Sequence, residues 1–370
     1  MPFRPRPASV LQRVALALLG LVATLSSLPA QDHGVVRAPP PGRGFMAPNN
    51  GGIWSWGDEI LVMYVNGPHR NGTACDGHST REELPGTTYD TSRSFDGGQT
   101  WTEHRTAFPR HVASTGWPGP RPVRLERPLN FADSSTVLHF QRNDEGLTYL
   151  YVSNDRGRTW QGPYDNLPKF KDGVSGRTHY RVDGPQALTA YMQVTERGAN
   201  DRVRHRSHAV HTVDGGLTWT LGTEISALPK WDDGRASEWA GHPSVAQWND
   251  HTFVASFRRG HQEGRGTRTA WFETTRSIDG GKTWQVLARL GESPGNNGCP
   301  SSIVTVPLPG GGKRLVNLMW LRPPDRFACG NSKLFARTSD DGGNTWSDDI
   351  VLRDDATGWD TGYPIATVRT

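Results

Sequence analysis

The sequence predicts an all-β protein built from repeated sheet units, and three observations lead to this prediction. An eight-residue motif of the form Ser/Thr-x-Asp-x-Gly-x-Thr-Trp occurs in five copies. Successive copies lie about 60 residues apart, which is typical of a repeated supersecondary unit that cannot bury its apolar face alone. No segment has a helical period, whereas 14 Trp, 43 Gly and 27 Pro indicate many short strands and turns. The copies span 94–101, 153–160, 212–219, 277–284 and 339–346.

Each position of the motif has a structural task. The Asp carboxylate can accept hydrogen bonds from the backbone N–H groups of its own turn, and the Gly two residues later can adopt the positive φ that such a turn needs. The Trp that ends each copy is expected to pack between neighbouring units, with a local partner for its N–H. We therefore favour a structural role over a catalytic or calcium-binding one for the five motif aspartates, which are Asp96, Asp155, Asp214, Asp279 and Asp341.

These copies resemble the Asp-boxes, or bacterial neuraminidase repeats, of the sialidase superfamily. Members of that superfamily are six-bladed β-propellers, and the resemblance covers residues 43–370. It implies a sialidase-like propeller of four-stranded blades with each box between the third and fourth strands. The box is specific for this architecture but not for an activity, because the superfamily includes sialidases, other glycan-cleaving enzymes and proteins that only bind sugars.

The first residues have the features of an export signal. Three arginines precede the apolar run 14–23, and small residues follow it up to Ala30. We expect residues 1–30 to be a signal peptide cleaved after Ala30, so that the chain is exported (periplasmic, cell-surface or secreted) without a lasting membrane span. An uncleaved membrane anchor is the alternative.

The rest of the chain is expected to form one propeller, residues 43–370, after a Pro- and Gly-rich leader at 31–42. The net charge of +4 falls to about +1 when the three arginines of the signal are left out. So small a positive charge does not indicate a nucleic-acid-binding protein. We expect a monomer whose partner is a glycan or glycoconjugate substrate.

Five units of four strands are expected, followed by the opening strand of a sixth unit at Tyr363–Arg369. The chain ends there, which suggests a truncated sixth blade; a five-bladed ring is the alternative. The expected strands are 45–56, 59–65, 87–95 and 101–106; 128–133, 136–141, 148–153 and 159–164; 177–183, 187–193, 208–213 and 219–224; 242–248, 252–258, 269–276 and 284–290; 301–306, 314–320, 333–339 and 350–353.

The family topology predicts where chemistry occurs. The boxes mark one face, so substrate should bind at the other face, where first strands begin and the loops between second and third strands lie. On that face Tyr363 falls where the resemblance places the nucleophile, and Arg258 resembles the second arginine of the carboxylate-binding triad. Arginine suits this task because guanidinium matches a carboxylate bidentately and stays charged.

Other parts of the family pattern are altered. Met46 stands in place of the first triad arginine, and Asn331 or Lys333 lies where the third is expected. His242 occupies the position of the glutamate that would activate the tyrosine, and Glu238 lies four residues earlier. The general acid could be Asp76, Glu82 or Glu83, and Arg322, Arg43 and Trp239 are further candidates for substrate binding.

Three functions remain open. The first is a sialidase-like exo-glycoside hydrolase acting on an anionic sugar, in which an activated Tyr363 attacks the anomeric carbon. The second is a polysaccharide lyase in which a Tyr and His pair facing an arginine removes a proton beside a uronate. The third is a propeller that only binds a glycan or protein.

Cysteines and glycines predict no cofactor. Cys299 and Cys329 could form a disulfide in an exported chain, which would leave Cys75 unpaired. Their spacing fits no zinc site, and the glycines belong to turns rather than to a nucleotide-binding loop.

Overall fold

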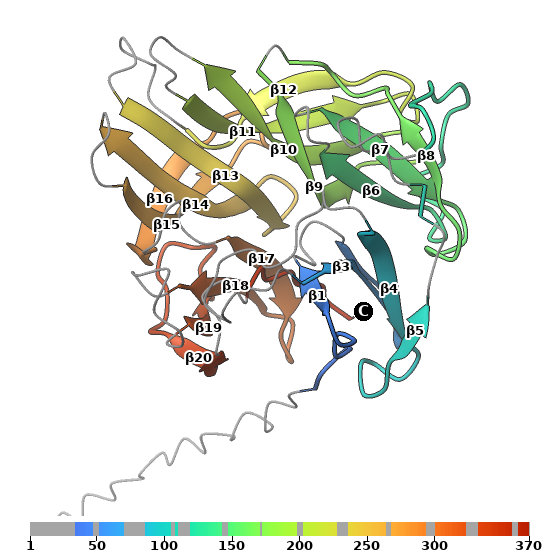
Figure 1. Cartoon of the computed structure of the whole chain (residues 1–370). Coiled ribbons are helices and arrows are strands. Elements are labelled where there is room, and N and C mark those ends of the chain that lie inside the picture. The colour runs from blue at the N-terminus through green and yellow to red at the C-terminus, as the bar shows by residue number, and fades with distance from the viewer. Residues whose placement is uncertain are drawn as a thin grey trace, which may run out of the picture. The chain divides into compact units, whose positions relative to one another are not determined.

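The computed structural model describes thirteen stretches of the chain, and these contain β-strands and turns but no α-helix (Figure 1). In these stretches no helix has the length and apolarity to cross a bilayer. The described residues are 34–46, 52–69, 86–104, 108–109, 119–142, 147–170, 172–197, 203–227, 236–263, 268–293, 300–322, 332–356 and 362–369.

The first sheet has the predicted order, but its first strand is divided. The first half, β1, pairs with the end of β3, where Arg43 lies opposite Pro68. The second half, β2, pairs with the beginning of β3, where Trp56 lies opposite Glu59. The strands are β1 (Arg43–Met46), β2 (Gly52–Trp56), β3 (Glu59–Pro68), β4 (Thr88–Ser94) and β5 (Thr102–His104).

The residues before this sheet are anchored to it. In the described part of the leader, Arg37 forms ion pairs with Asp90 at 2.9 Å and with Glu103 at 2.7 Å. Its guanidinium also lies over the ring of Phe45. The end of the leader is therefore a fixed part of the first sheet.

The second sheet corrects one prediction, because residues 128–133 do not form its first strand. Instead, the N–H of Leu129 donates to the carbonyl of Gly215, and the N–H of Phe131 donates to the carbonyl of Pro185. These carbonyls belong to turns of the following unit, so the segment bonds to turns rather than to a strand. The strands of this sheet are β6 (Val137–Arg142), β7 (Thr148–Ser153) and β8 (Gln161–Tyr164).

The third and fourth units have the four predicted strands each and join into one sheet. The joint is a short parallel pair in which Arg204 lies opposite Glu238 and His205 lies opposite Trp239. The strands are β9 (Val174–Val182), β10 (Leu188–Arg197), β11 (Val203–Thr212), β12 (Thr220–Glu224), β13 (Ala236–Gln247), β14 (Phe253–Glu263), β15 (Arg268–Ser277) and β16 (Gln285–Glu292).

The fifth unit is a sheet of four strands in chain order. These strands are β17 (Ser301–Pro307), β18 (Lys313–Leu321), β19 (Ser332–Ser339) and β20 (Ile350–Ala356). The segment that follows, Tyr363–Arg369, was predicted to be a strand, but it has no assigned pairing. It is held by the N–H of Ala366, which donates to Ser302 Oγ at 3.1 Å, and by an ion pair of Arg369 with Asp58. The segment thus links the fifth unit to the first sheet without forming a ladder.

Apolar side chains from neighbouring sheets share common cores. Tyr151 of the second sheet packs with Leu61 and Met63 of the first, and Leu138 packs with Met192 of the third unit. Within residues 34–370 the sheets follow one another in chain order, each packed against the next (Figure 1). The predicted all-β propeller is confirmed, while the number of blades that completes its ring stays a prediction.

Four of the five box tryptophans lie where the sequence predicts, and Trp101 of the first box is in none of the shared cores that the described residues form. Trp160, Trp219, Trp284 and Trp346 each contribute to a core shared by two neighbouring units. Burying such large rings contributes strongly to sheet packing. The ring N–H of Trp219 donates to a box carbonyl at 3.0 Å, whereas among the described residues those of Trp160 and Trp346 have no hydrogen-bond partner.

The box aspartates close their own turns, as predicted. Asp96 accepts from the Thr100 N–H at 2.8 Å and from the Thr100 hydroxyl at 2.5 Å. These bonds lower the pKa of Asp96 to about 2, with the Thr100 hydroxyl as the largest cause. The residue after each box aspartate has positive φ; it is glycine in four copies and Arg156, with φ 58°, in the second.

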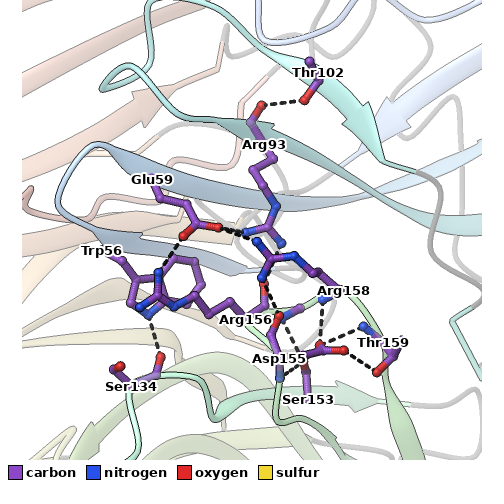
Figure 2. A network of polar contacts seen from close by, with 11 residues as sticks. Trp56, Glu59, Arg93, Thr102, Ser134, Ser153, Asp155, Arg156, Arg158 and Thr159 are labelled. Atoms are coloured by element: carbon purple, nitrogen blue, oxygen red, sulfur yellow. Dashed lines mark hydrogen bonds and ion pairs between the residues drawn. The ribbon is translucent and has the colours of Figure 1, made fainter.

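Arg156 belongs to an ion-pair network between the first two sheets (Figure 2). Glu59 at the start of β3 pairs with Arg93 of β4 and, at 2.7 Å, with Arg156. Arg93 also donates to the carbonyl of Arg156 at 2.6 Å. Arg158 reaches the same carboxylate at 3.4 Å from a more exposed position. The carboxylate of Glu59 therefore holds the second box turn against the first sheet.

We predict that Glu59→Gln destabilises the fold. The substitution leaves the buried guanidinium of Arg93, with a side chain 5% exposed, without its counter-ion. Such a loss costs about 3 kcal/mol of unfolding free energy. Urea unfolding monitored by Trp fluorescence measures it.

The matched control is Arg158→Gln, because the Arg158 side chain is 48% exposed. An exposed pair contributes less than about 1 kcal/mol, so this variant should unfold almost like the parent. Equal effects of the two substitutions would contradict the assigned role of the Glu59 carboxylate.

Candidate functional site

A β-bulge in β13 places the central residue of the candidate site. Gly241 lies opposite Arg258 of β14, but the next paired residues are Ser244 and Ser256, so two residues of β13 oppose one of β14. His242 lies in this bulge with φ 58°, a conformation rare for a residue other than glycine. Such backbone outliers occur often at functional sites.

The His242 ring is buried beside an arginine of another unit. The residue is 6% exposed, and its Nε2 lies 3.1 Å from the Arg177 guanidinium of β9. Its Nδ1 is buried and has no hydrogen-bond partner among the described residues. A neutral imidazole needs one donor and one acceptor partner, so this ring has one nitrogen without its partner.

Three guanidinium groups surround this ring. Burial lowers the pKa of His242 well below its ordinary value, and the positive charges of Arg258, Arg177 and Arg322 lower it further. A nearby partly buried imidazole, His205, acts in the same direction. His242 is therefore a neutral group within a positively charged environment.

Tyr363 lies against the same ring. The centroids of Tyr363 and His242 are 5.8 Å apart at an angle of 38°. An Arg322 nitrogen lies 3.4 Å from the phenol oxygen, and the guanidinium also lies over the phenol ring. Just before it, a Cβ on Gly362 would lie 1.9 Å from the Trp320 ring, so glycine is needed where the chain reaches the site.

We call these five residues the His242 cluster: Arg177, His242, Arg258, Arg322 and Tyr363. They come from the third, fourth and fifth units and from the C-terminal segment. Arg258 lies five residues beyond Phe253, which pairs with Ser277 at the start of the fourth box. The cluster is thus displaced from the box turns along the strands, as the topology predicts.

The structure gives Glu238 an ion-pair partner. Its carboxylate forms an ion pair at 3.0 Å with Arg204, which is 1% exposed. Removing Glu238 from this pair would leave a buried charge, so the carboxylate is held by a structural partner. Of Glu238 and His242, the two candidates for activating the tyrosine, His242 is the one whose ring contacts Tyr363.

Two predicted substrate-binding residues lie elsewhere. Trp239 is 7% exposed and covers Gly260, where a Cβ would lie 2.3 Å from its ring, so its face is not open to a sugar. Arg43 donates to the side chain and carbonyl of Asn66 and to the carbonyl of Gly86. These contacts fix the edge of the first sheet.

Seven of the candidate site residues and cysteines named in the sequence analysis lie outside the described residues: Cys75, Asp76, Glu82, Glu83, Cys299, Cys329 and Asn331. The general acid and the disulfide remain predictions. Conversely, the sequence reasoning missed Arg177, although it lies near the beginning of a first strand, where site residues were expected.

A separate cavity of about 380 Å³ lies among β2, β6, β9 and the C-terminal segment. Its wall includes Trp54, Trp56, Tyr180 and Ala366, and none of the five cluster side chains lines it. In the described part of the chain, no group of three His, Cys, Asp or Glu side chains could hold a metal ion.

The arrangement can bind negative charge and stabilise it at the phenol. Guanidinium groups bind carboxylates through paired, charge-assisted hydrogen bonds. Arg322 lies where charge would develop on the Tyr363 oxygen during proton transfer or nucleophilic attack. The cluster thus places guanidinium groups and a phenol hydroxyl side by side.

Comparisons with known proteins agree with this architecture. The model of the BNR repeat-like domain matches residues 73–370. No curated protein sequence matches the chain.

Solved structures with a similar fold include a protein of unknown function from Dyadobacter fermentans. It is 20% identical, the alignment covers 88% of this chain and 91% of that one, and the TM-score is 0.54. An α-L-arabinanase of Penicillium chrysogenum is 16% identical, with 81% and 79% covered and a TM-score of 0.46. A Trypanosoma rangeli sialidase is 14% identical, with 84% and 49% covered and a TM-score of 0.44.

We predict that the His242 ring stays neutral at pH values at which an ordinary histidine is protonated. The pKa of His242 is lower in the folded chain than in the unfolded chain. Below about pH 6.5 the unfolded chain therefore binds a proton that the folded chain does not. The free energy of unfolding thus falls as the pH decreases from about 6.5 toward the folded pKa. NMR titration of the histidine ring signals measures this directly. A His242 signal that titrates near pH 6.5 would contradict the assigned environment.

Arg258→Met should raise the pKa of His242, because it removes the largest of the charges that lower it after burial. Arg142→Met is the control, since Arg142 lowers the pKa of His205 instead. An unchanged His242 titration in Arg258→Met would show that this charge does not act on the ring.

Proposed function

The chain belongs to the family of BNR repeat-like domains, and from this premise we propose that it is a carbohydrate-active enzyme that cleaves a glycan at a sugar bearing a carboxylate. The reaction that we propose first is sialidase-like exo-glycoside hydrolysis with Tyr363 as the nucleophile. The expected product is a free anionic sugar released from the end of a glycan.

The observation that carries this proposal is the convergence of three arginines on a neutral, buried histidine beside Tyr363. Guanidinium groups bind carboxylates through paired, charge-assisted hydrogen bonds. A carboxylated sugar held by these arginines would bring its reacting carbon near the phenol. Arg177 could take the place of the first arginine of the carboxylate-binding triad, whose position is occupied by Met46. It can do so because it reaches the cluster from β9.

In this reaction the Tyr363 phenol gives its proton to water, its oxygen bonds to the anomeric carbon, and the bond to the leaving oxygen breaks. A general acid, for which Asp76 remains the sequence-based candidate, gives a proton to the leaving oxygen. Water then cleaves the tyrosyl–sugar bond. Arg322 favours the step because it stabilises negative charge on the phenol oxygen.

The second candidate is a polysaccharide lyase, which the contact between Tyr363 and His242 favours. The engagement of Glu238 with Arg204 supports this alternative, because hydrolysis calls for a carboxylate to activate the tyrosine. In a lyase, the Tyr363 phenolate would remove the proton beside the uronate carboxylate, a carbon–carbon double bond would form, and the glycosidic oxygen would leave after taking that proton from Tyr363. The arginines would neutralise the carboxylate.

The products distinguish the two reactions. The full chain is incubated with terminal sialosides, glucuronides and uronate polymers, and products are analysed by mass spectrometry and ultraviolet absorbance. In hydrolysis, the masses of the products add up to the mass of the substrate plus one water. In elimination, no water is added, and one product is an unsaturated uronate that absorbs ultraviolet light.

We predict that Tyr363→Phe lowers kcat by at least about 10³-fold with either reaction, because it removes the reacting oxygen and leaves the ring in place. Tyr164→Phe, a change of the same kind in β8, should keep full activity. Matching circular dichroism spectra establish that both variants fold.

Full activity of Tyr363→Phe would exclude Tyr363 from the chemistry. If the parent cleaves no glycan of the panel but binds one, the protein is a binding propeller and the enzyme proposal fails.

A further inference from the structure

The two nitrogens of His242 have different surroundings. Nε2 lies 3.1 Å from a terminal nitrogen of Arg177, whereas the buried Nδ1 has no hydrogen-bond partner among the described residues. The ring therefore has one occupied position and one unoccupied position for a hydrogen bond.

The contact with Arg177 decides which nitrogen carries the proton. A guanidinium group has only donors and remains protonated in proteins, so its partner must accept. Nε2 is therefore the acceptor, and the single proton of the neutral ring is on Nδ1. A ring protonated on Nε2 would direct two N–H groups toward each other.

We propose that Arg177 fixes the Nδ1–H tautomer of His242, and that His242 serves the site as a hydrogen-bond donor to an oxygen of the bound anionic sugar rather than as a base. Arg177 is then a positioning residue, because it acts through His242. The role of His242 toward a sugar rests on the proposed function, whereas its tautomer does not.

The charges around the ring support a donor. The guanidinium groups of Arg177 on β9, Arg258 on β14 and Arg322 after β18 all act on His242. His205 on β11 and Tyr363 in the C-terminal segment complete the surroundings that act on or touch it. A proton moving onto the ring would add a positive charge to this group of arginines. Donation keeps the ring neutral.

The buried Nδ1–H also has an energetic reason to meet a ligand. A donor that is buried without an acceptor loses its hydrogen bond to water without replacement. An anionic oxygen attracted by the arginines and entering beside Tyr363 would restore that bond. The neutral histidine would thereby favour sugars that place an acceptor next to their carboxylate.

The tautomer can be measured without substrate. Long-range ¹H–¹⁵N spectra of the full chain labelled at histidine distinguish a protonated nitrogen from an acceptor nitrogen. His242 should show Nδ1–H in the parent. In Arg177→Met, which cannot donate, this preference should be lost or shifted toward Nε2–H; in Arg177→Lys, which can still donate, it should persist. Nε2–H in the parent would overturn the proposal whatever the protein does to glycans.

The donor role is tested with D-glucuronate and N-acetylneuraminate as binding probes. Asn carries a donor near the position of Nδ1 and tolerates positive φ, whereas Gln places its donor nearer Nε2. His242→Asn should therefore bind the tighter probe within about threefold of the parent, and His242→Gln and His242→Ala should bind it at least about tenfold more weakly.

Equal weakening by Asn, Gln and Ala would overturn the donor role, as would a parent that shows Nδ1–H but binds neither probe. With an active parent, an acidic limb of kcat/KM that disappears in His242→Asn would identify the ring as a base and reject the proposal. If the parent shows Nδ1–H and binds a probe as expected but cleaves nothing, the donor role stands while the enzyme proposal fails.

Discussion

The fold depends on one local interaction, the hydrogen bonding of the box aspartate to the backbone and hydroxyl of its own turn. Asp279 accepts from the N–H groups of Lys282 and Thr283 and from the Thr283 hydroxyl, and the same pattern recurs around Asp155, Asp214 and Asp341. These turns fix the connection between the last two strands of each unit and place a Trp against the neighbouring unit. Because the strands are antiparallel, turning the chain at one face directs the opposite strand ends to the other face. The His242 cluster lies away from the boxes for this reason.

The sequence predicted most of the fold because the signals were local and repeated. The strands adjoining each box follow from the turn, and the motif predicts a Trp between units, which four of the five copies show. The prediction of a strand at residues 128–133 was wrong because backbone groups of this segment form hydrogen bonds to turns around Pro185 and Gly215. No local sequence pattern indicates these bonds. The division of the first strand into β1 and β2 did have a local signal, the turn-forming run from Pro48 to Gly52, which the predicted strand 45–56 ignored.

The candidate site was predicted less completely. Tyr363, Arg258, Arg322 and His242 were named from position and resemblance, and the structure brings them together. Arg177 was missed because its contact with His242 spans 65 positions of the chain. The bulge that turns His242 toward it depends on the pairing of β13 with β14. The sequence does not reveal that Trp239 covers Gly260 or that Glu238 pairs with Arg204.

The central claim is that the arginines of the His242 cluster form the binding site of a carboxylated sugar. A crystal structure of the chain soaked with D-glucuronate or N-acetylneuraminate tests it most directly. The account predicts that the sugar carboxylate lies within about 3.2 Å of nitrogens from at least two of Arg177, Arg258 and Arg322. A sugar bound instead in the cavity beside Trp54 and Tyr180, with the arginines untouched, would contradict it.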